Sequence, residues 1–115
     1  MAIETLKKQK DFQHVYQKGK VFGNRNLVLY YIENGKGTNR LGVIVSKKVS
    51  NRAVVRNRIR RQLKEAYRKN EARYAVGYDL ILIAKATCID ERFGVIEKSL
   101  NHLFYKKKLM RQQHD

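Results

Sequence analysis

Apolar and polar positions follow one another with two spacings along the chain, and each spacing predicts one type of element. From 26 to 32 nearly every residue is apolar or aromatic, and a period of two puts Val28, Tyr30 and Ile32 on one side of a strand. The apolar run 79–85 is typical of a central strand that is covered on both faces. A short strand is expected at 21–23. The turn 33–37 is expected to close a hairpin onto a strand at 40–46.

Three other segments have the spacing of helices. In the first, at 11–18, Phe12 and Tyr16 share a face; we expect Asp11 to cap it and Gly19 to end it in a left-handed conformation. The second spans about 52–69. The third spans about 89–109, with Asp90 as its expected cap and a basic tail over 106–111.

The order of these elements predicts the fold class. Helix, three strands, helix, strand and helix argue for an α/β (α+β) two-layer sandwich around one mixed central sheet. The helix between two strands implies a crossover. No proline, repeat or change of composition marks a linker, so residues 1–115 are expected to form a single domain.

The helix at 52–69 separates its apolar residues from its cations. Val55, Ile59 and Leu63 fall on one side of a helical projection. The opposite side gathers Asn57, Arg60, Arg61, Lys64 and Arg68. Arginine offers forked donors that match phosphate oxygens and keeps its charge at working pH. This side is therefore predicted to bind phosphate; a solvated basic surface is the alternative.

The charge of the chain supports an anionic partner. Lys and Arg number 26 against 10 Asp and Glu, a net charge of +16, which exceeds what solubility asks of a small domain. Nucleic acid is favoured over a membrane surface because no apolar run approaches about 18 residues. The single cysteine, Cys88, gives no disulfide framework, is expected to be half-buried at a strand end, and fits a reducing cytoplasm.

The residues that could serve as catalytic groups or as metal ligands do not have the spacing that either role requires. His14, His102 and His114 lack the spacing of metal ligands, so no metal site on the protein is predicted. The acidic residues form no pair suited to acid and base catalysis, and no serine or cysteine lies beside a base. An autonomous nuclease is not expected, nor is a small-molecule substrate.

Several short segments, spread over nearly the whole chain, carry a family resemblance. They are Asp11-Phe12, Gly19, Asn24-Arg25, Leu41-Gly42, Ser46-Lys47-Lys48, the block Arg56-Asn57-Arg58-Ile59-Arg60-Arg61, Asp79 with Ala84-Lys85, and Ser99-Leu100 with His102-Leu103-Phe104. With them the chain resembles the protein component of bacterial ribonuclease P, whose RNR signature corresponds to Arg56-Asn57-Arg58. Ser50 stands where many members have glycine; Ser50 or Asn51 is expected to cap the basic helix.

The resemblance implies a non-catalytic protein subunit. Its partner is a catalytic RNA that removes the 5′ leader from precursor tRNA with bound Mg²⁺, and the crossover is expected to be left-handed, against the usual preference. The basic helix is expected to bind the RNA subunit through Arg52, Arg56, Asn57, Arg58, Arg60, Arg61, Lys64 and Arg68. A groove is expected to hold the leader strand with Phe12, Tyr16, Val28, Tyr30, Ser46, Lys47 and Lys48.

Two alternatives stay open at the level of the sequence. A structural ribosomal protein is also small and basic and often has an α/β fold, so composition alone does not separate it from a ribonuclease P subunit. Phe12 and Tyr16 lie one helical turn apart, and such pairs are more often core residues than a platform for bases. The basic setting favours base stacking, which tolerates any base.

Overall fold

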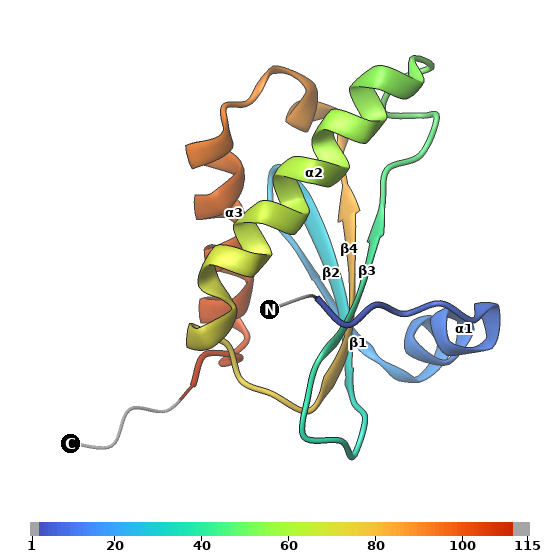
Figure 1. The fold of residues 1–115 in the computed structure, drawn as a ribbon, viewed down its shortest axis with the longest axis vertical. Helices are drawn as coiled ribbons and strands as arrows, with labels where there is room; N and C mark the ends of the chain where they lie inside the picture. Colours follow the sequence, from blue (N-terminus) through green and yellow to red (C-terminus); the bar gives the residue numbers. More distant parts are fainter. Residues whose placement is uncertain (1–2, 112–115) are drawn as a thin grey trace.

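The computed structural model describes residues 3–111. It confirms the predicted fold class: three α-helices and one mixed four-stranded sheet. In chain order the elements are α1 (Gln9–Lys18), β1 (Lys20–Gly23), β2 (Leu27–Glu33), β3 (Arg40–Ile44), α2 (Ala53–Asn70), η1 (Glu71–Arg73), β4 (Tyr78–Ala84), η2 (Ala86–Asp90) and α3 (Phe93–Lys106). Figure 1 shows α1 on one side of the sheet and both longer helices on the other.

The sheet order is β1-β2-β4-β3, so the predicted hairpin between β2 and β3 is wrong. β4 lies between them, antiparallel to β2 and parallel to β3, with Leu82 paired to Leu29 on one side and to Val43 on the other. The nearly continuous apolar sequence of β4 suits this central place. The predicted crossover is confirmed as β3-α2-β4; its left-handed sense stays an expectation from the resemblance.

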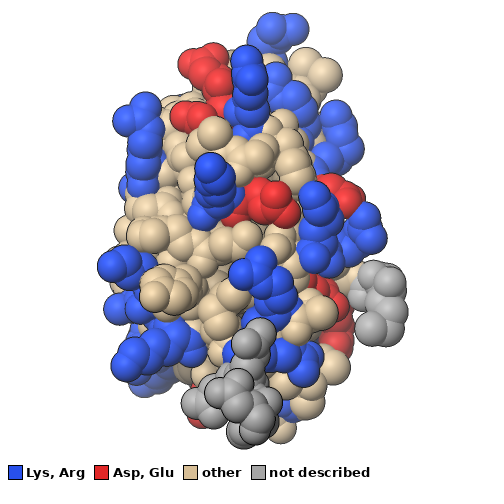
Figure 2. Space-filling model, turned by 90° about the vertical axis from the view of Figure 1, so that its left-hand side faces the viewer, with Lys and Arg blue, Asp and Glu red and all other residues tan. Residues whose placement is uncertain are grey.

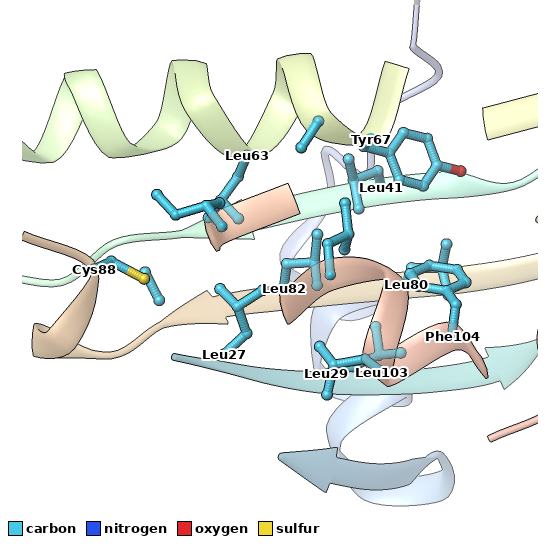
Figure 3. Close-up of a cluster of buried hydrophobic side chains, with 14 of the residues drawn as sticks. Leu27, Leu29, Leu41, Leu63, Tyr67, Leu80, Leu82, Cys88, Leu103 and Phe104 are labelled. Carbon is cyan, nitrogen blue, oxygen red and sulfur yellow. The ribbon is translucent and has the colours of Figure 1, made fainter. Parts of the chain in front are cut away.

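The main core fills the space between the sheet and the two long helices (Figure 3). Leu27 and Leu29 of β2 and Leu80 and Leu82 of β4 are fully buried there. Each points to this side because strand residues alternate between faces. The opposing helices contribute Ile59, Leu63, Ala66, Tyr67, Ile96, Leu100, Leu103 and Phe104. We call this side of the sheet the closed face.

The helix ends differ from the predicted caps. α1 begins after Lys8 without a side-chain cap, and Asp11 lies inside its first turn. α3 begins after Arg92, because Asp90 belongs to η2. Neither Ser50 nor Asn51 caps α2, which follows Arg52; the Ser50 hydroxyl oxygen instead accepts the Arg52 backbone N–H. The observed caps Lys8, Arg52 and Arg92 lie one to three residues from the predicted ones, which is the usual error of a helix boundary predicted from sequence.

Gly19 ends α1 for a different reason than expected. Its backbone is extended, with φ −81° and ψ 173°, and not left-handed. A Cβ at this position would lie 2.5 Å from the Val15 carbonyl oxygen and 2.8 Å from that of Tyr31. The chain therefore needs glycine here because α1 and β2 approach each other closely, not because of backbone conformation.

Candidate nucleic-acid interface

The second face of the sheet is only partly covered: among the described residues, α1 is the one helix that packs on it, together with Leu6 of the segment before α1 (Figure 1). Val15 of α1 and Ile81 of β4 are fully buried at the centre of this contact. Phe12 lies over Gly42 of β3, where a Cβ would sit 2.6 Å from the ring atom Cε1 of Phe12. Gly42 thus lets α1 approach the sheet, and Phe12 acts in part as a packing residue.

Tyr16 and Tyr30 form an aromatic pair beside this contact. Their ring centroids are 4.9 Å apart and the rings are nearly perpendicular, an edge-to-face geometry. The Tyr16 side chain remains 38% exposed. Burial, together with Tyr30, raises the pKa of the Tyr16 phenol. The Tyr16 ring is therefore uncharged at neutral pH and does not repel an approaching phosphate.

A row of three half-buried aliphatic side chains continues from the tyrosine pair across the sheet. Val28 is paired with Ile83, and Ile83 with Ile44, so the three share the face of Tyr30. The exposed residues Ser46, Lys47 and Lys48 follow β3 after the buried Val45. We call the row and the tyrosine pair the open face. It brings together three predicted leader-binding residues, Tyr16, Val28 and Tyr30; Phe12 packs beside it over Gly42, and 46–48 lie beyond the end of β3.

Ile44 and Ile83 of this face were not predicted from the sequence. Both are ordinary strand residues, and their side-chain direction relative to Tyr30 depends on which strands are neighbours. Side chains alternate between the two faces in every strand, but β3 and β4 are nearly continuously apolar, so their sequences do not show which side chains lie on which face. What placed these residues beside Val28 is the insertion of β4 between β2 and β3, which no local pattern encodes.

An ion-pair network around the buried Asp79 fixes the start of α1 to the sheet. Arg40 donates from Nε and Nη2 to the two carboxylate oxygens of Asp79, at 2.9 and 2.6 Å, and Asn34 Nδ2 donates to Asp79 Oδ1 at 2.9 Å. Arg40 Nη1 also lies 3.5 Å from Asp11 Oδ2. Burial alone would raise the pKa of Asp79, but the hydrogen bonds from Arg40 and Asn34 outweigh it, and the pKa is lowered. Asp79 is therefore charged, and Arg40 links it to α1.

The arginines of α2 divide into two groups, and the first holds structure. Arg58 Nη2 donates to the Ile89 carbonyl oxygen at 2.8 Å, and Arg56 Nη1 donates to that of Ser50 at 2.9 Å. Arg60, expected on the phosphate-facing side, is half-buried and donates to the carbonyl oxygen of Val45 and to the side chain of Asn57. These bonds attach α2 to its flanking loops.

The second group is exposed and shares one side of α2. Asn57, Arg61, Lys64 and Arg68 follow one another at four, three and four residues, which brings them onto one helical face. Arg68 is paired with Glu65. Within residues 3–111, no salt bridge engages Arg61 or Lys64. Arg52, just before the helix, is also exposed. We call Asn57, Arg61, Lys64 and Arg68 the α2 basic face.

Figure 2 looks onto the side of the molecule that carries α2 and α3. Lys and Arg side chains are spread over this side, whereas acidic side chains appear in few places. This distribution follows from the net charge of +16. A field of one sign over a whole surface attracts polyanions over a distance of roughly 10 Å at moderate salt.

The described residues offer little for metal or thiol chemistry. No group of three His, Cys, Asp or Glu side chains in residues 3–111 is arranged to hold a metal ion. His14 and His102 are exposed, and His114 lies outside the described residues. Cys88 is fully buried within η2, not half-buried as expected, and its Sγ donates to the Asn26 carbonyl oxygen. Burial raises the pKa of this thiol. None of the helices in residues 3–111 combines the length and apolar character that a membrane span requires.

Fold and surfaces together define a small, strongly basic α/β protein with a half-covered sheet and an arginine-rich crossover helix. The model of the family Ribonuclease P matches residues 2–108, and the chain belongs to this family. It is 43% identical over 109 residues to the ribonuclease P protein component of Alkaliphilus oremlandii, covering 95% of each chain.

Solved structures agree with the family. The RNase P protein of Staphylococcus aureus superposes with a TM-score of 0.85 at 33% identity, covering 96% of this chain and 100% of that one. The RNase P protein of Thermotoga maritima gives a TM-score of 0.82 at 26% identity, with 90% and 96% covered. Membership of this family identifies the chain as a protein subunit of ribonuclease P. The alternative of a structural ribosomal protein does not fit these relatives.

Proposed function

We propose that this protein assists the catalytic RNA of ribonuclease P in the cytoplasm by binding both the RNA subunit and the 5′ leader of precursor tRNA. The open face receives the leader, and the α2 basic face contacts the RNA subunit. The observation that carries the proposal is the partial cover of the sheet: α1 leaves an aromatic pair and an aliphatic row accessible beside exposed lysines.

The chemistry of the open face suits a single strand of variable sequence. Aromatic and aliphatic surfaces bind the faces of bases, which all bases possess, and lysines meet the backbone phosphates. Lys47 and Lys48 are exposed at the end of β3. Since leaders differ between tRNAs, a surface without hydrogen-bond demands on the bases is what the task requires.

The α2 basic face suits a structured RNA partner. Arg61 and Lys64 are free for phosphate contact among the described residues, while Arg56, Arg58 and Arg60 hold the helix in place. Of the eight residues expected to contact the RNA subunit, these three have a structural role as well. Because these three arginines fix the orientation of α2, Arg61 and Lys64 project from the helix in a fixed direction.

The polypeptide is proposed to take no part in bond cleavage. Mg²⁺ ions are assigned to the RNA subunit, and the protein contributes by holding the substrate strand and by neutralising phosphate charge. Both effects lower the concentration of Mg²⁺ at which substrate and RNA subunit can associate, because fewer counterions are then needed.

The test is a precursor-tRNA cleavage assay at low Mg²⁺ with the cognate RNA subunit. Addition of this protein is expected to restore cleavage at the leader junction that the RNA alone performs poorly at the same Mg²⁺ concentration. Cleavage that is unaltered by the protein at every Mg²⁺ concentration would contradict the proposal, and so would cleavage by the protein without the RNA.

A further inference from the structure

A second group of aromatic and basic side chains lies on α3, apart from the open face. Lys98, His102 and Tyr105 are exposed and follow one another at four and three residues, so they share one side of this helix. Tyr105 is 72% exposed, the largest value among the large hydrophobic side chains of the described residues. Such exposure gives its ring no packing role in the fold.

Phe22 of β1 extends this group. Its ring centroid lies 6.1 Å from that of His102, and Lys107 Nζ lies 5.0 Å from the ring centroid of Phe22. Phe22 packs against the core cluster of the closed face, on the opposite side of the sheet from Tyr30. We call Phe22, His102, Tyr105, Lys106 and Lys107 the α3 surface.

The composition of this surface matches that of single-strand binding sites. A lone exposed tyrosine is common and needs no explanation. Tyr105, however, shares a helix face with the ring of His102, which lies beside the ring of Phe22. Lys106 and Lys107, which follow Tyr105 in the chain, are exposed. No salt bridge among residues 3–111 engages Lys106 or Lys107. Rings that stack with bases and free cations that track phosphates are the two components of such sites.

We propose that the α3 surface binds an unpaired segment of the RNA subunit. α3 packs beside α2 on the closed face, so both helices present their outer sides in the same layer (Figure 1). The leader is assigned to the opposite face of the sheet. A large RNA that lies along α2 is therefore the polyanion nearest to Tyr105. The choice of partner rests on the proposed function.

The experiment measures the affinity of the full chain for the cognate RNA subunit. Tyr105→Ala is expected to weaken binding by about 5- to 150-fold, the effect of losing one stacked base, while Tyr105→Phe keeps it. Lys106→Ala is expected to flatten the plot of log affinity against log salt by roughly 0.7 to 0.9. Lys36→Ala removes a lysine that is also exposed, in the β2–β3 loop, and serves as the charge-matched control.

The outcomes separate this proposal from the previous one. Wild-type affinity for Tyr105→Ala would overturn the inference and leave the proposed function intact. A change confined to the preference of the assembled enzyme for precursor over mature tRNA would also overturn it, because the surface would then bind substrate. If Tyr105→Ala weakens RNA-subunit binding but a variant of Arg61 and Lys64 does not, the inference stands and the role proposed for α2 fails.

Discussion

The two faces of the sheet are made by the same strands and differ in what covers them. On the closed face, Leu29 and Leu82 are fully buried beneath two long helices. On the open face, Val28 and Ile83 are only half-buried, although each is next in the chain to one of these two fully buried leucines. The alternation of a strand thus assigns one set of side chains to stability and leaves the next set for binding.

This division explains why the smaller layer contains a single short helix. α1 has ten residues against eighteen in α2, and it crosses the sheet where Gly42 admits Phe12. A longer or second helix there would bury the aliphatic row of Val28, Ile44 and Ile83. The incomplete cover costs hydrophobic burial, and the closed face supplies the stability that offsets it.

The comparison is tested most strongly by two neighbouring residues of β4. Leu82→Ala is expected to lower the free energy of unfolding by about 2 to 5 kcal/mol, because it empties a filled core position. Ile83→Ala, on the half-buried side, should cost less and should weaken precursor binding instead. Urea unfolding of both variants provides the measurement. Equal losses of stability would show that the two faces are equally packed.

The ion-pair network beneath α1 is expected to have the next largest effect. Asp79→Asn removes the charge that Arg40 bonds, and a hydrogen bond to a charged group is worth about 1.5 to 3 kcal/mol. Because the pKa of Asp79 is lowered in the folded state, its contribution is present above the ordinary value of about 3.9 and is lost as pH falls through the lowered one.

Thermal melts between about pH 2 and pH 6 test this prediction. The wild-type protein should lose its advantage over Asp79→Asn as the solution becomes acidic, so the two melting curves converge. A difference in melting temperature that stays constant over the whole range would assign the loss to altered packing and not to the charge.

A smaller effect on stability is expected within α2. Arg61→Ala combined with Lys64→Ala should change the free energy of unfolding by no more than about 0.5 kcal/mol, as is usual for surface positions. The same variant should flatten the log–log salt dependence of RNA-subunit binding by roughly 1 to 2. Arg58→Ala serves as the contrast: it removes the bond to Ile89, so stability should fall. An unchanged salt slope in the double variant would remove α2 from the RNA interface.

Local patterns in the sequence sufficed for most elements. The period of two in β2, the apolar run of β4 and the helical spacing around Ile59 and Leu100 all led to the correct element type. In β2 and the helices the pattern follows from burial that depends on the face a residue occupies, and in β4 it follows from burial on both faces. The family resemblance added the function class, which no spacing provides.

The remaining features depend on distant parts of the chain. The place of β4 between β2 and β3 brought Ile83 beside Val28, and Arg58 bonds a carbonyl group 31 residues away. Both are non-local. Asp11 and Asp90 are good caps by residue type, but Asp11 lies inside the first turn of α1 and pairs with Arg40, and Asp90 belongs to η2. Long-range pairing thus decided what local preference left open.

The central claim is that the open face binds the leader strand, and Tyr16 tests it most directly. Phe12 is a poorer choice because it packs over Gly42. With the assembled enzyme, Tyr16→Ala is expected to weaken binding of precursor tRNA by about 5- to 150-fold and to leave mature tRNA, which lacks a leader, nearly unaffected. Tyr105→Ala, an exposed tyrosine on the other side of the sheet, should leave the ratio of the two affinities unchanged. Equal weakening for precursor and mature tRNA by Tyr16→Ala, or a melt showing that this variant unfolds, would contradict the claim and make Tyr16 a core residue.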